Sequence, residues 1–162
     1  MKEISFDFEN VGGLQELYAV PFSNFRGVGM NYAKGTRYPR MSNRDEIIVI
    51  PMYADDTFQF IEEKDEADGG TFYKVSISGL IPKMEGVNEQ LIEELERGQW
   101  VVLSRDNNGV IHLSGSADVP LTCTTNKDSG MAFAARNAIT FEFSGNQSSP
   151  SVIIDAETLA EL

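Results

Sequence analysis

The chain has 162 residues and a formal net charge of −12 at pH 7, because 25 Asp and Glu residues oppose 13 Lys and Arg residues. A chain of this length can bury a substantial core without disulfides or metal ions, so we expect a single domain over residues 1–162. The negative charge repels nucleic-acid phosphates and anionic membranes, which argues against specific nucleic-acid binding and against membrane attachment.

Apolar and polar residues alternate at the start of the chain. Ile4 and Phe6 share one face of a predicted strand over residues 3–8, and a second strand is expected at 14–22. Pro21 indicates that the second strand ends there or lies at a sheet edge. No stretch resembles the apolar region of a signal peptide, and none approaches the about 18 apolar residues of a membrane span. We therefore expect a protein made in the bacterial cytoplasm without a signal peptide.

A basic segment that contains several glycines follows at about residues 23–44. It holds five of the 13 basic residues, and no acidic residue occurs between Glu16 and Asp45. The loss of hydrophobic periodicity predicts a long loop. This loop is interpreted either as a contact arm for an acidic surface, such as a neighbouring copy, or as a solvated loop whose charges offset nearby acids. The candidate inter-subunit contacts are its basic residues, Arg26, Lys34, Arg37, Arg40 and Arg44.

The middle of the chain predicts further β-structure. Glu46–Met52 is a continuous apolar run, which is typical of a strand buried on both faces. Alternating residues over 57–62 and 72–81 predict a long hairpin. The acidic stretch Glu62–Asp68 and the two glycines after it lie between these strands, so we expect them to form a solvated tip.

An amphipathic helix is predicted at about residues 88–97, and a hairpin follows directly at Gln99–Gly115. One apolar stripe runs along the helix, Leu91, Ile92 and Leu95. The Asp-Asn-Asn-Gly sequence at 106–109 supplies residues that tolerate positive φ in a tight turn. We expect the helix to pack on the sheet that contains this hairpin, with Trp100 as a buried anchor.

Three short strands are expected in the C-terminal part, Leu121–Thr125, Ala138–Ser144 and Val152–Ile154. Met131–Asn137 is read as either a helical turn or a loop, and the last residues as a short flexible tail. The pattern as a whole predicts a mainly β fold, an antiparallel β-sandwich or barrel-like domain with one α-helix.

No group of side chains in the sequence marks a catalytic centre. His112 is the sole histidine and lies in a predicted strand, where the alternation places it on the face opposite Ile111 and Leu113, with no nucleophile or acid motif beside it. Cys123 is flanked by threonines, and we interpret it as a small buried hydrophobe that cannot form an internal disulfide. One His and one Cys cannot supply a standard zinc site. We therefore expect no catalytic residues, no cofactors and no enzymatic activity.

Glu62, Asp65 and Asp68 are weak candidates for calcium ligands, because a hard cation needs several oxygen ligands at close spacing. Their spacing does not match the calcium loop of an EF-hand. A solvated hairpin tip is the favoured interpretation of these residues, and calcium binding is the alternative.

Several short motifs occur in an order that resembles a known group of proteins. They are the Val-Gly-Gly turn at 11–13, LYAVP at 17–21, VVLSRDNNGVIHLSG at 101–115, and DSG…ARN…TFEFSG…P over 128–150. In these motifs the chain is similar to small uncharacterised proteins from prophage and mobile-element regions of Bacteroides-type bacteria, which in turn resemble phage tail tube and related virion proteins. The resemblance implies a β-sandwich or barrel with one helix, copies stacked as rings, and no catalytic residues.

We therefore expect a non-enzymatic, phage-type virion structural protein that is tail-tube-like and self-assembles through loop and edge-strand contacts. Its partners would be further copies, arranged as rings or tubes, and other virion proteins. Its location would be the bacterial cytoplasm before assembly and then a virion or phage-tail-like particle. The alternative is a ligand-binding β-sandwich, for example a carbohydrate-binding or calcium-dependent adhesion module.

Overall fold

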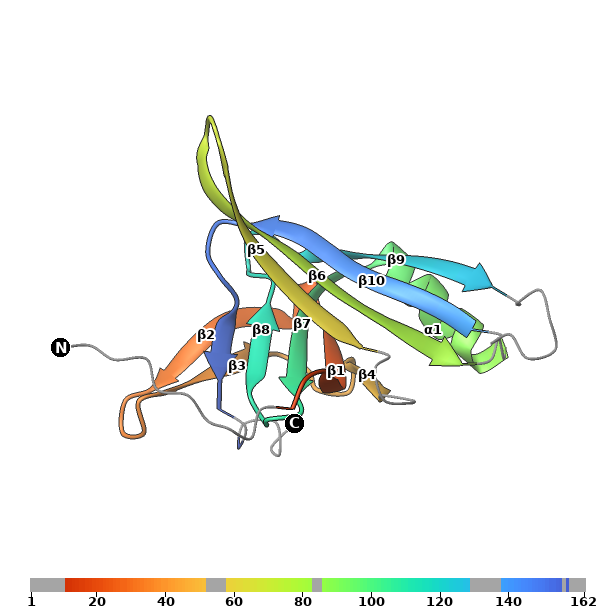
Figure 1. Cartoon of the computed structure of the whole chain (residues 1–162). Helices are drawn as coiled ribbons and strands as arrows, with labels where there is room; N and C mark the ends of the chain where they lie inside the picture. Colours follow the sequence, from red (N-terminus) through yellow and green to blue (C-terminus); the bar gives the residue numbers. More distant parts are fainter. Residues whose placement is uncertain (1–10, 52–57, 83–85, 129–137, 156, 158–162) are drawn as a thin grey trace.

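The computed structural model describes residues 11–51, 58–82, 86–128, 138–155 and 157 (Figure 1). Within these ranges the chain is mainly antiparallel β-structure with one α-helix, which confirms the predicted fold class. The elements are β1 (Leu14–Pro21), a 3-10 helix (Phe22–Asn24), β2 (Phe25–Asn31), β3 (Thr36–Met41), β4 (Ile48–Pro51), β5 (Gln59–Ala67), β6 (Gly70–Pro82), α1 (Gly86–Arg97), β7 (Gln99–Asp106), β8 (Ile111–Ser114), β9 (Leu121–Asp128), β10 (Ala138–Gln147) and β11 (Val152–Ile154). The predicted strand at 3–8, the segment Met131–Asn137 and most of the C-terminal tail lie outside the described residues.

Nine of the described strands form one sheet, which β7 divides into two layers (Figure 1). The order is β11-β8-β7-β9-β10-β6-β5, while β1 pairs with the other edge of β7 and β4 pairs with β1. Gln99 and Trp100 of β7 pair with β9, whereas Val102–Arg105 pair with β8. Because β7 changes partner along its length, it belongs to both layers, and the arrangement is sandwich-like.

Side chains connect the two ends of this sheet. The Phe60 ring of β5 stacks on His112 of β8, with ring centroids 5.0 Å apart and an interplanar angle of 20°. Glu62 Oε2 accepts a hydrogen bond from the backbone N of Ser151, just before β11, at 2.6 Å. We call these two contacts the seam. The seam brings β5 against β8 and the start of β11, which makes the fold barrel-like.

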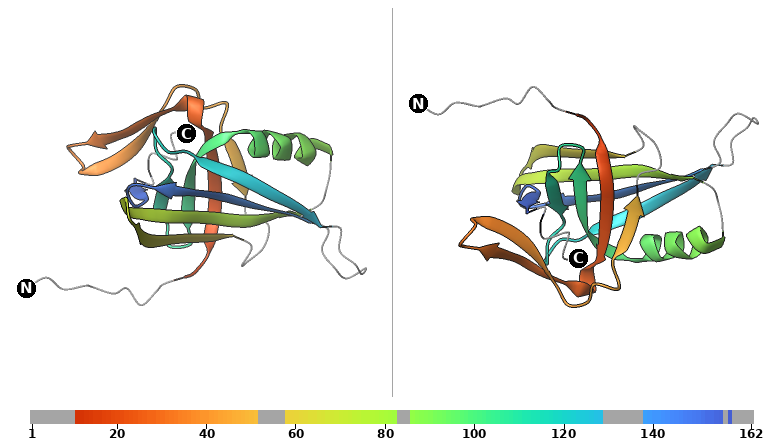
Figure 2. Two further views of the ribbon diagram at one scale, coloured as in Figure 1. Left: turned by 90° about the horizontal axis from the view of Figure 1, so that it is seen from above. Right: turned by 90° about the horizontal axis from the view of Figure 1, so that it is seen from below.

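The main core lies between the layers and under α1, which runs along β9 (Figure 2). Trp100 is 2% exposed and donates from Nε1 to the carbonyl of Leu95 at 2.8 Å. Phe141 and Phe143 of β10 pack edge to face, with centroids 5.7 Å apart. Burial of each such side chain contributes roughly 1.5–3 kcal/mol. The prediction that Trp100 anchors the core under the helix is therefore confirmed.

The predicted apolar stripe of α1 is only partly buried. Ile92 and Leu95 are each 1% exposed and enter the main core, whereas Leu91 is 39% exposed. The helix begins at Gly86, slightly earlier than the predicted position of about 88.

A second core lies on the opposite face of β7, beneath the β2–β3 hairpin. Val101 and Leu103 point into this core, whereas Trp100 and Val102 point into the main core, because side chains alternate along a strand. The hairpin contributes three side chains to it, Phe25, Val28 and Met41. An isolated two-stranded hairpin is marginally stable in water, so this anchoring accounts for its order.

Two predictions are wrong. Residues 23–44 do not form a long loop, since β2 and β3 pair within them and extend from one end of the molecule (Figure 2). The apolar run Glu46–Met52 is not buried on both faces, because Val49 of β4 is 54% exposed. The hairpins predicted at 57–81 and 99–115 are confirmed as β5–β6 and β7–β8. The acidic residues expected at the first tip lie mostly along β5.

Candidate functional site

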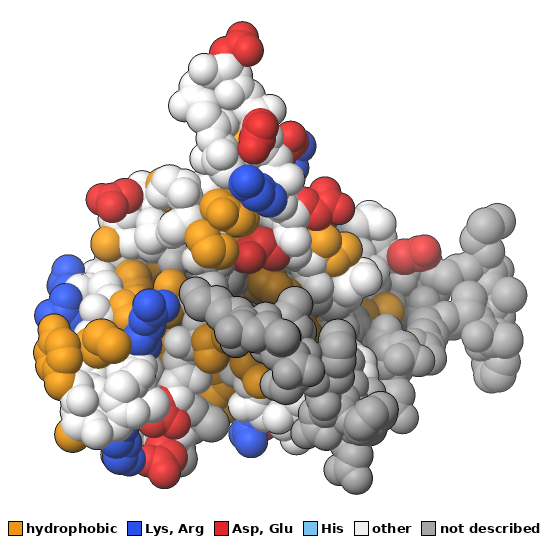
Figure 3. Space-filling model, turned by 60° about the vertical axis from the view of Figure 1, so that its left-hand side comes forward, with side chains coloured by type: hydrophobic (Ala, Val, Ile, Leu, Met, Phe, Trp, Pro, Cys, Tyr) orange, Lys and Arg blue, Asp and Glu red, His pale blue; other side chains and the backbone are white. Residues whose placement is uncertain are grey.

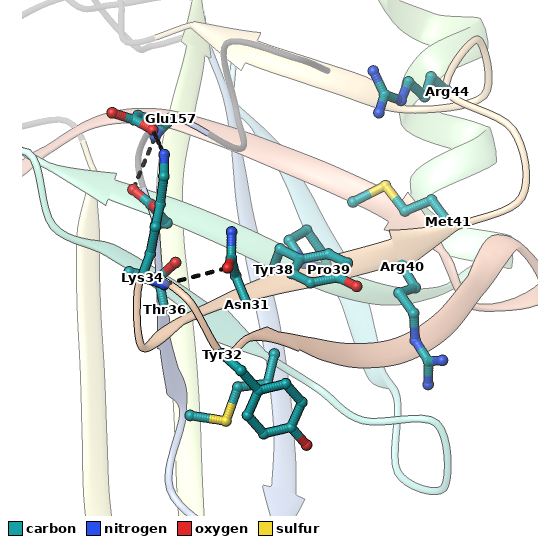
Figure 4. Close-up of a pocket in the computed structure, with 12 residues that line it drawn as sticks. Asn31, Tyr32, Lys34, Thr36, Tyr38, Pro39, Arg40, Met41, Arg44 and Glu157 are labelled. Atoms are coloured by element: carbon teal, nitrogen blue, oxygen red, sulfur yellow. Dashed lines mark hydrogen bonds and ion pairs between the residues drawn. The ribbon is translucent and has the colours of Figure 1, made fainter.

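The β2–β3 hairpin and the residue after β11 enclose an open groove of about 820 Å³. Its lining combines aromatic, apolar and charged side chains, among them Tyr32, Tyr38, Met41, Arg40, Arg44 and Glu157. Lys34 and Glu157 lie at one end of the groove, and Arg40 and Arg44 lie at the other (Figure 4). We call residues 25–44 the basic hairpin.

The turn of the basic hairpin is built around Asn31. Its Oδ1 accepts hydrogen bonds from the backbone N of Ala33 at 3.1 Å and of Lys34 at 3.3 Å. The backbone N of Gly35 donates to the Asn31 carbonyl at 2.8 Å, with Gly35 at φ +68°. Such a φ favours glycine, so the residues that looked like a loop in the sequence specify a tight turn between two strands.

Tyr38 lies across β2 at Gly29. A Cβ built on Gly29 would come within 2.4 Å of the Tyr38 ring. Glycine at this position therefore gives the ring room to lie flat on the paired strand, where it forms part of the groove wall.

Asn24 attaches the base of the basic hairpin to the rest of the protein. It is 3% exposed, and its Oδ1 accepts from the backbone N of Ser42 at 2.9 Å and of Asn43 at 2.6 Å. Its Nδ2 donates to the carbonyl of Asn43. These bonds satisfy a buried amide and join the two ends of the hairpin.

The five basic residues predicted as inter-subunit contacts all lie within the basic hairpin, and all are exposed. Three of these side chains line the groove, Lys34, Arg40 and Arg44. Lys34 forms an ion pair with Glu157, and Arg26 donates from Nε to Ser42 Oγ at 2.6 Å. The structure brings the five candidates together on one hairpin, and Arg40 and Arg44 lie at the end of the groove opposite Glu157.

Large apolar side chains share this surface with the arginines. Tyr32 is 87% exposed, Met30 46% and Tyr38 37%. Figure 3 shows hydrophobic and basic side chains gathered at this end of the molecule, while acidic side chains mark the projection formed by β5 and β6. Aromatic residues, Met and Arg are enriched in protein interfaces, so the surface has the composition of a contact site.

The calcium candidates do not converge. Glu62 holds the seam by accepting from Ser151, Asp65 pairs with Lys74, and Asp68 lies exposed in the turn after β5. The hydrogen bond from Lys74 is the main cause that lowers the pKa of Asp65 below its usual 3.8. No group of three or more His, Cys, Asp or Glu residues in the described ranges is placed to hold a metal ion. The structure thus does not support these three residues as one site.

His112 and Cys123 have structural environments. His112 is half-buried and stacked on Phe60, so the open face suggested by its position in the strand is covered by a ring. Cys123 is 5% exposed, and burial is the main cause that raises the pKa of its thiol to about 12. A thiol of that pKa is protonated at neutral pH and is a poor nucleophile, which confirms the interpretation of Cys123 as a small buried hydrophobe.

The aromatic part of the groove and the anchoring Asn24 were not predicted from the sequence. Val28 and Met30 do alternate with glycines, which is the period of a strand, but glycine carries no side chain that would reveal the pattern. For Asn24 no local signal exists, because its three partners lie at Ser42 and Asn43 and depend on the hairpin folding back.

Comparisons with protein-family models, with curated proteins and with solved structures found no match. Among the described residues, no helix is both long enough and apolar enough to cross a bilayer.

Proposed function

We propose that this protein is a non-enzymatic structural protein that acts by self-assembly, as a tail-tube-like component of a phage-type virion or phage-tail-like particle. The supporting observation is the basic hairpin, which presents exposed tyrosines, a methionine and arginines on a molecule whose net charge is −12. On this proposal the chain is made in the bacterial cytoplasm and then enters the particle, where its partners are further copies and other virion proteins.

Exposed apolar area supports a contact role for the basic hairpin. Monomeric proteins rarely leave adjacent large apolar side chains uncovered, and such patches often mark sites of association. Tyr32 is 87% exposed, so most of its surface is accessible to a second copy. Charge supports the same role, because a basic surface on an acidic protein is complementary to most of the surface of another copy.

Unpaired strand edges offer a second means of association. Among the described strands, β5 pairs with β6 alone and β4 pairs with β1 alone. A strand edge carries backbone donors and acceptors that another chain can use. The charged side chains of β5 disfavour uncontrolled pairing there, so any contact at β5 has to satisfy those charges as well.

Sedimentation velocity across protein concentration and salt tests the proposal. We expect species larger than the monomer that dissociate as salt rises, because salt screens contacts between exposed charges. Tyr32→Ser should raise the concentration needed for assembly, whereas Leu91→Ser, at an exposed position on α1, should leave it unchanged. A wild-type protein that stays monomeric at high concentration in every buffer contradicts the proposal.

Carbohydrate binding in the same groove is the second candidate function. It is favoured by Tyr32 and Tyr38, whose exposed rings line the groove. Aromatic rings in such a position can stack on the faces of sugar rings. Calorimetric titration with soluble oligosaccharides distinguishes the two candidates, since heat of binding that is lost in Tyr32→Ser without any self-association would favour the second. The calcium-dependent version predicts a higher melting temperature in millimolar calcium.

A further inference from the structure

We propose that the groove of the basic hairpin receives the tip of the β5–β6 hairpin of a second copy. This inference rests on the proposed self-assembly and names the two surfaces that meet. We call residues 62–74 the acidic tip.

The acidic tip carries the opposite charge to the groove. Residues 62–74 hold five carboxylates against two lysines, Lys64 and Lys74. Both lysines already have partners within the tip, because Lys64 Nζ lies 3.5 Å from Glu66 and Lys74 pairs with Asp65. The tip therefore keeps an excess of negative charge, and its exposed acids include Glu63 and Asp68.

The end of the acidic tip, beyond the residues that pair with β10, also projects from the body of the protein. The pairing of β10 with β6 ends at Tyr73, whereas β5 and β6 remain paired as far as Ala67 and Gly70. Figure 1 shows the end of this hairpin standing clear of the other strands, and Figure 3 shows acidic side chains on it. A narrow projection of this kind can enter an open groove of about 820 Å³ on a neighbour.

One end of the groove suits this tip better than the other. Glu157 occupies the end near Lys34, so an acidic partner is repelled there. Arg40 and Arg44 lie at the opposite end, and the acidic residues that follow Arg44, Asp45 and Glu46, do not line the groove. Guanidinium groups pair with carboxylates in bidentate fashion, which favours the arginine end as the place where the tip docks.

An apolar contact accompanies the charges. Phe72 lies in the acidic tip, on the same face as Asp65 and Lys74, and is half-buried under the Lys74 ammonium, whose Nζ is 5.5 Å from the ring centroid. The tyrosines of the groove offer Phe72 an aromatic surface. Because the tip and the groove are separate surfaces of one chain, each copy can give its tip to one neighbour and receive a tip from another. Such a heterologous contact builds rings or filaments.

A charge swap tests the inference. The groove variant is Arg40→Glu with Arg44→Glu, and the tip variant is Glu66→Lys with Asp68→Lys. Each alone places like charges at the contact, so we expect the concentration needed for assembly to rise about tenfold or more. Mixed in equal amounts, the two variants have complementary tips and grooves in both directions. We expect the mixture to assemble again, as alternating copies, in sedimentation velocity.

The control variant is Glu93→Lys with Glu94→Lys on α1, which changes the net charge as much as the tip variant does. It should assemble like the wild type. Circular dichroism and thermal melting establish that each variant is folded, which is expected because the changed residues are exposed. If the wild type assembles but the tip variant does so equally well, or if the mixture fails to recover, this inference is wrong and self-assembly stands. If the wild type never assembles, both proposals fail.

Discussion

Trp100 depends on the absence of a side chain at Gly98. A Cβ built on Gly98 would lie 2.5 Å from the Trp100 ring, and Gly98 is not among the glycines with positive φ. Glycine is therefore required here because the Trp100 ring leaves no room for a Cβ, and not because of the backbone conformation. The same ring donates its Nε1 proton to the Leu95 carbonyl, so a displaced ring would also leave a buried polar pair unmade.

Gly98→Ala should lower the free energy of unfolding by about 1–3 kcal/mol, because the added methyl overpacks the core under α1. Gly69→Ala is the matched control, since nothing lies within 4 Å of a Cβ at Gly69, and its effect should stay within about 0.5 kcal/mol. Urea unfolding followed by far-UV circular dichroism measures both. Equal stability of the two variants would contradict the role assigned to Gly98.

Cys123 makes stability depend on pH in the alkaline range. Burial raises its pKa from the ordinary 9.0 to about 12 in the folded protein, so the native thiol keeps a proton that the unfolded chain releases. The stabilising contribution is complete below about pH 9 and is lost as pH rises towards 12. At pH 10 the loss is about 1 kcal/mol.

Urea unfolding at pH 8 and at pH 10 tests this. Cys123→Ala lacks the thiol, so its loss of stability between the two pH values should be smaller than that of the wild type by about 1 kcal/mol. The variant removes the effect of the thiol and keeps that of the lysines and tyrosines. Parallel losses in the two proteins would show that Cys123 does not titrate as described.

At the scale of elements, the basic hairpin is held by a side chain outside its own strands. Asn24→Ala removes three hydrogen bonds to Ser42 and Asn43 and should lower the free energy of unfolding by about 2–3 kcal/mol. It should also speed tryptic cleavage after Lys34 and Arg37, because local opening of the hairpin becomes more frequent. Asn126→Ala, at an exposed position on β9, is the control. Cleavage at the wild-type rate in Asn24→Ala would contradict this anchoring role.

Elements with strong local signals could be predicted. The β7–β8 hairpin has a turn in which Asp106 Oδ1 accepts from the backbone N of Asn108 and of Val110, and in which Gly109 has φ +83°. These interactions are local, so the residue types reveal them. The alternating apolar residues of β10 likewise follow from its contact with one core.

Elements whose order comes from distant partners could not be predicted. β2 and β3 contain glycines and arginines, and they are ordered by the second core and by Asn24. The exposure of Val49 likewise depends on which strands lie beside β4, which the sequence does not state. For the candidate site, the run of basic residues in the sequence was enough to predict the arginines. The contribution of Tyr32 and Tyr38 could not be predicted, because it depends on the strands that place them beside a groove.

At the scale of the whole molecule, β7 is the strand on which both cores are built. Its alternate side chains enter the main core and the second core, and its two edges pair with β1 on one side and with β8 and β9 on the other. A single domain over 1–162 stays a prediction. Within the described ranges, the acidic tip belongs to the nine-stranded sheet, whereas the basic hairpin is a separate two-stranded sheet that packs on the second core of β7.

The seam has a consequence for motion. A ring stack and one hydrogen-bonded carboxylate hold β5 against β8 and the start of β11. These are side-chain contacts, and among the described strands only β6 pairs with the backbone of β5. The backbone amides of β5 that point away from β6 therefore have no ladder partners there. Hydrogen exchange of these amides requires only local opening, whereas β6 is paired on both sides and should stay protected. Because β6 stays paired with β10 as far as Tyr73, only the end of the β5–β6 hairpin beyond that residue can tilt while every ladder stays intact. A filament joined through that hairpin could then bend by small changes of angle at each copy, without unfolding any of them.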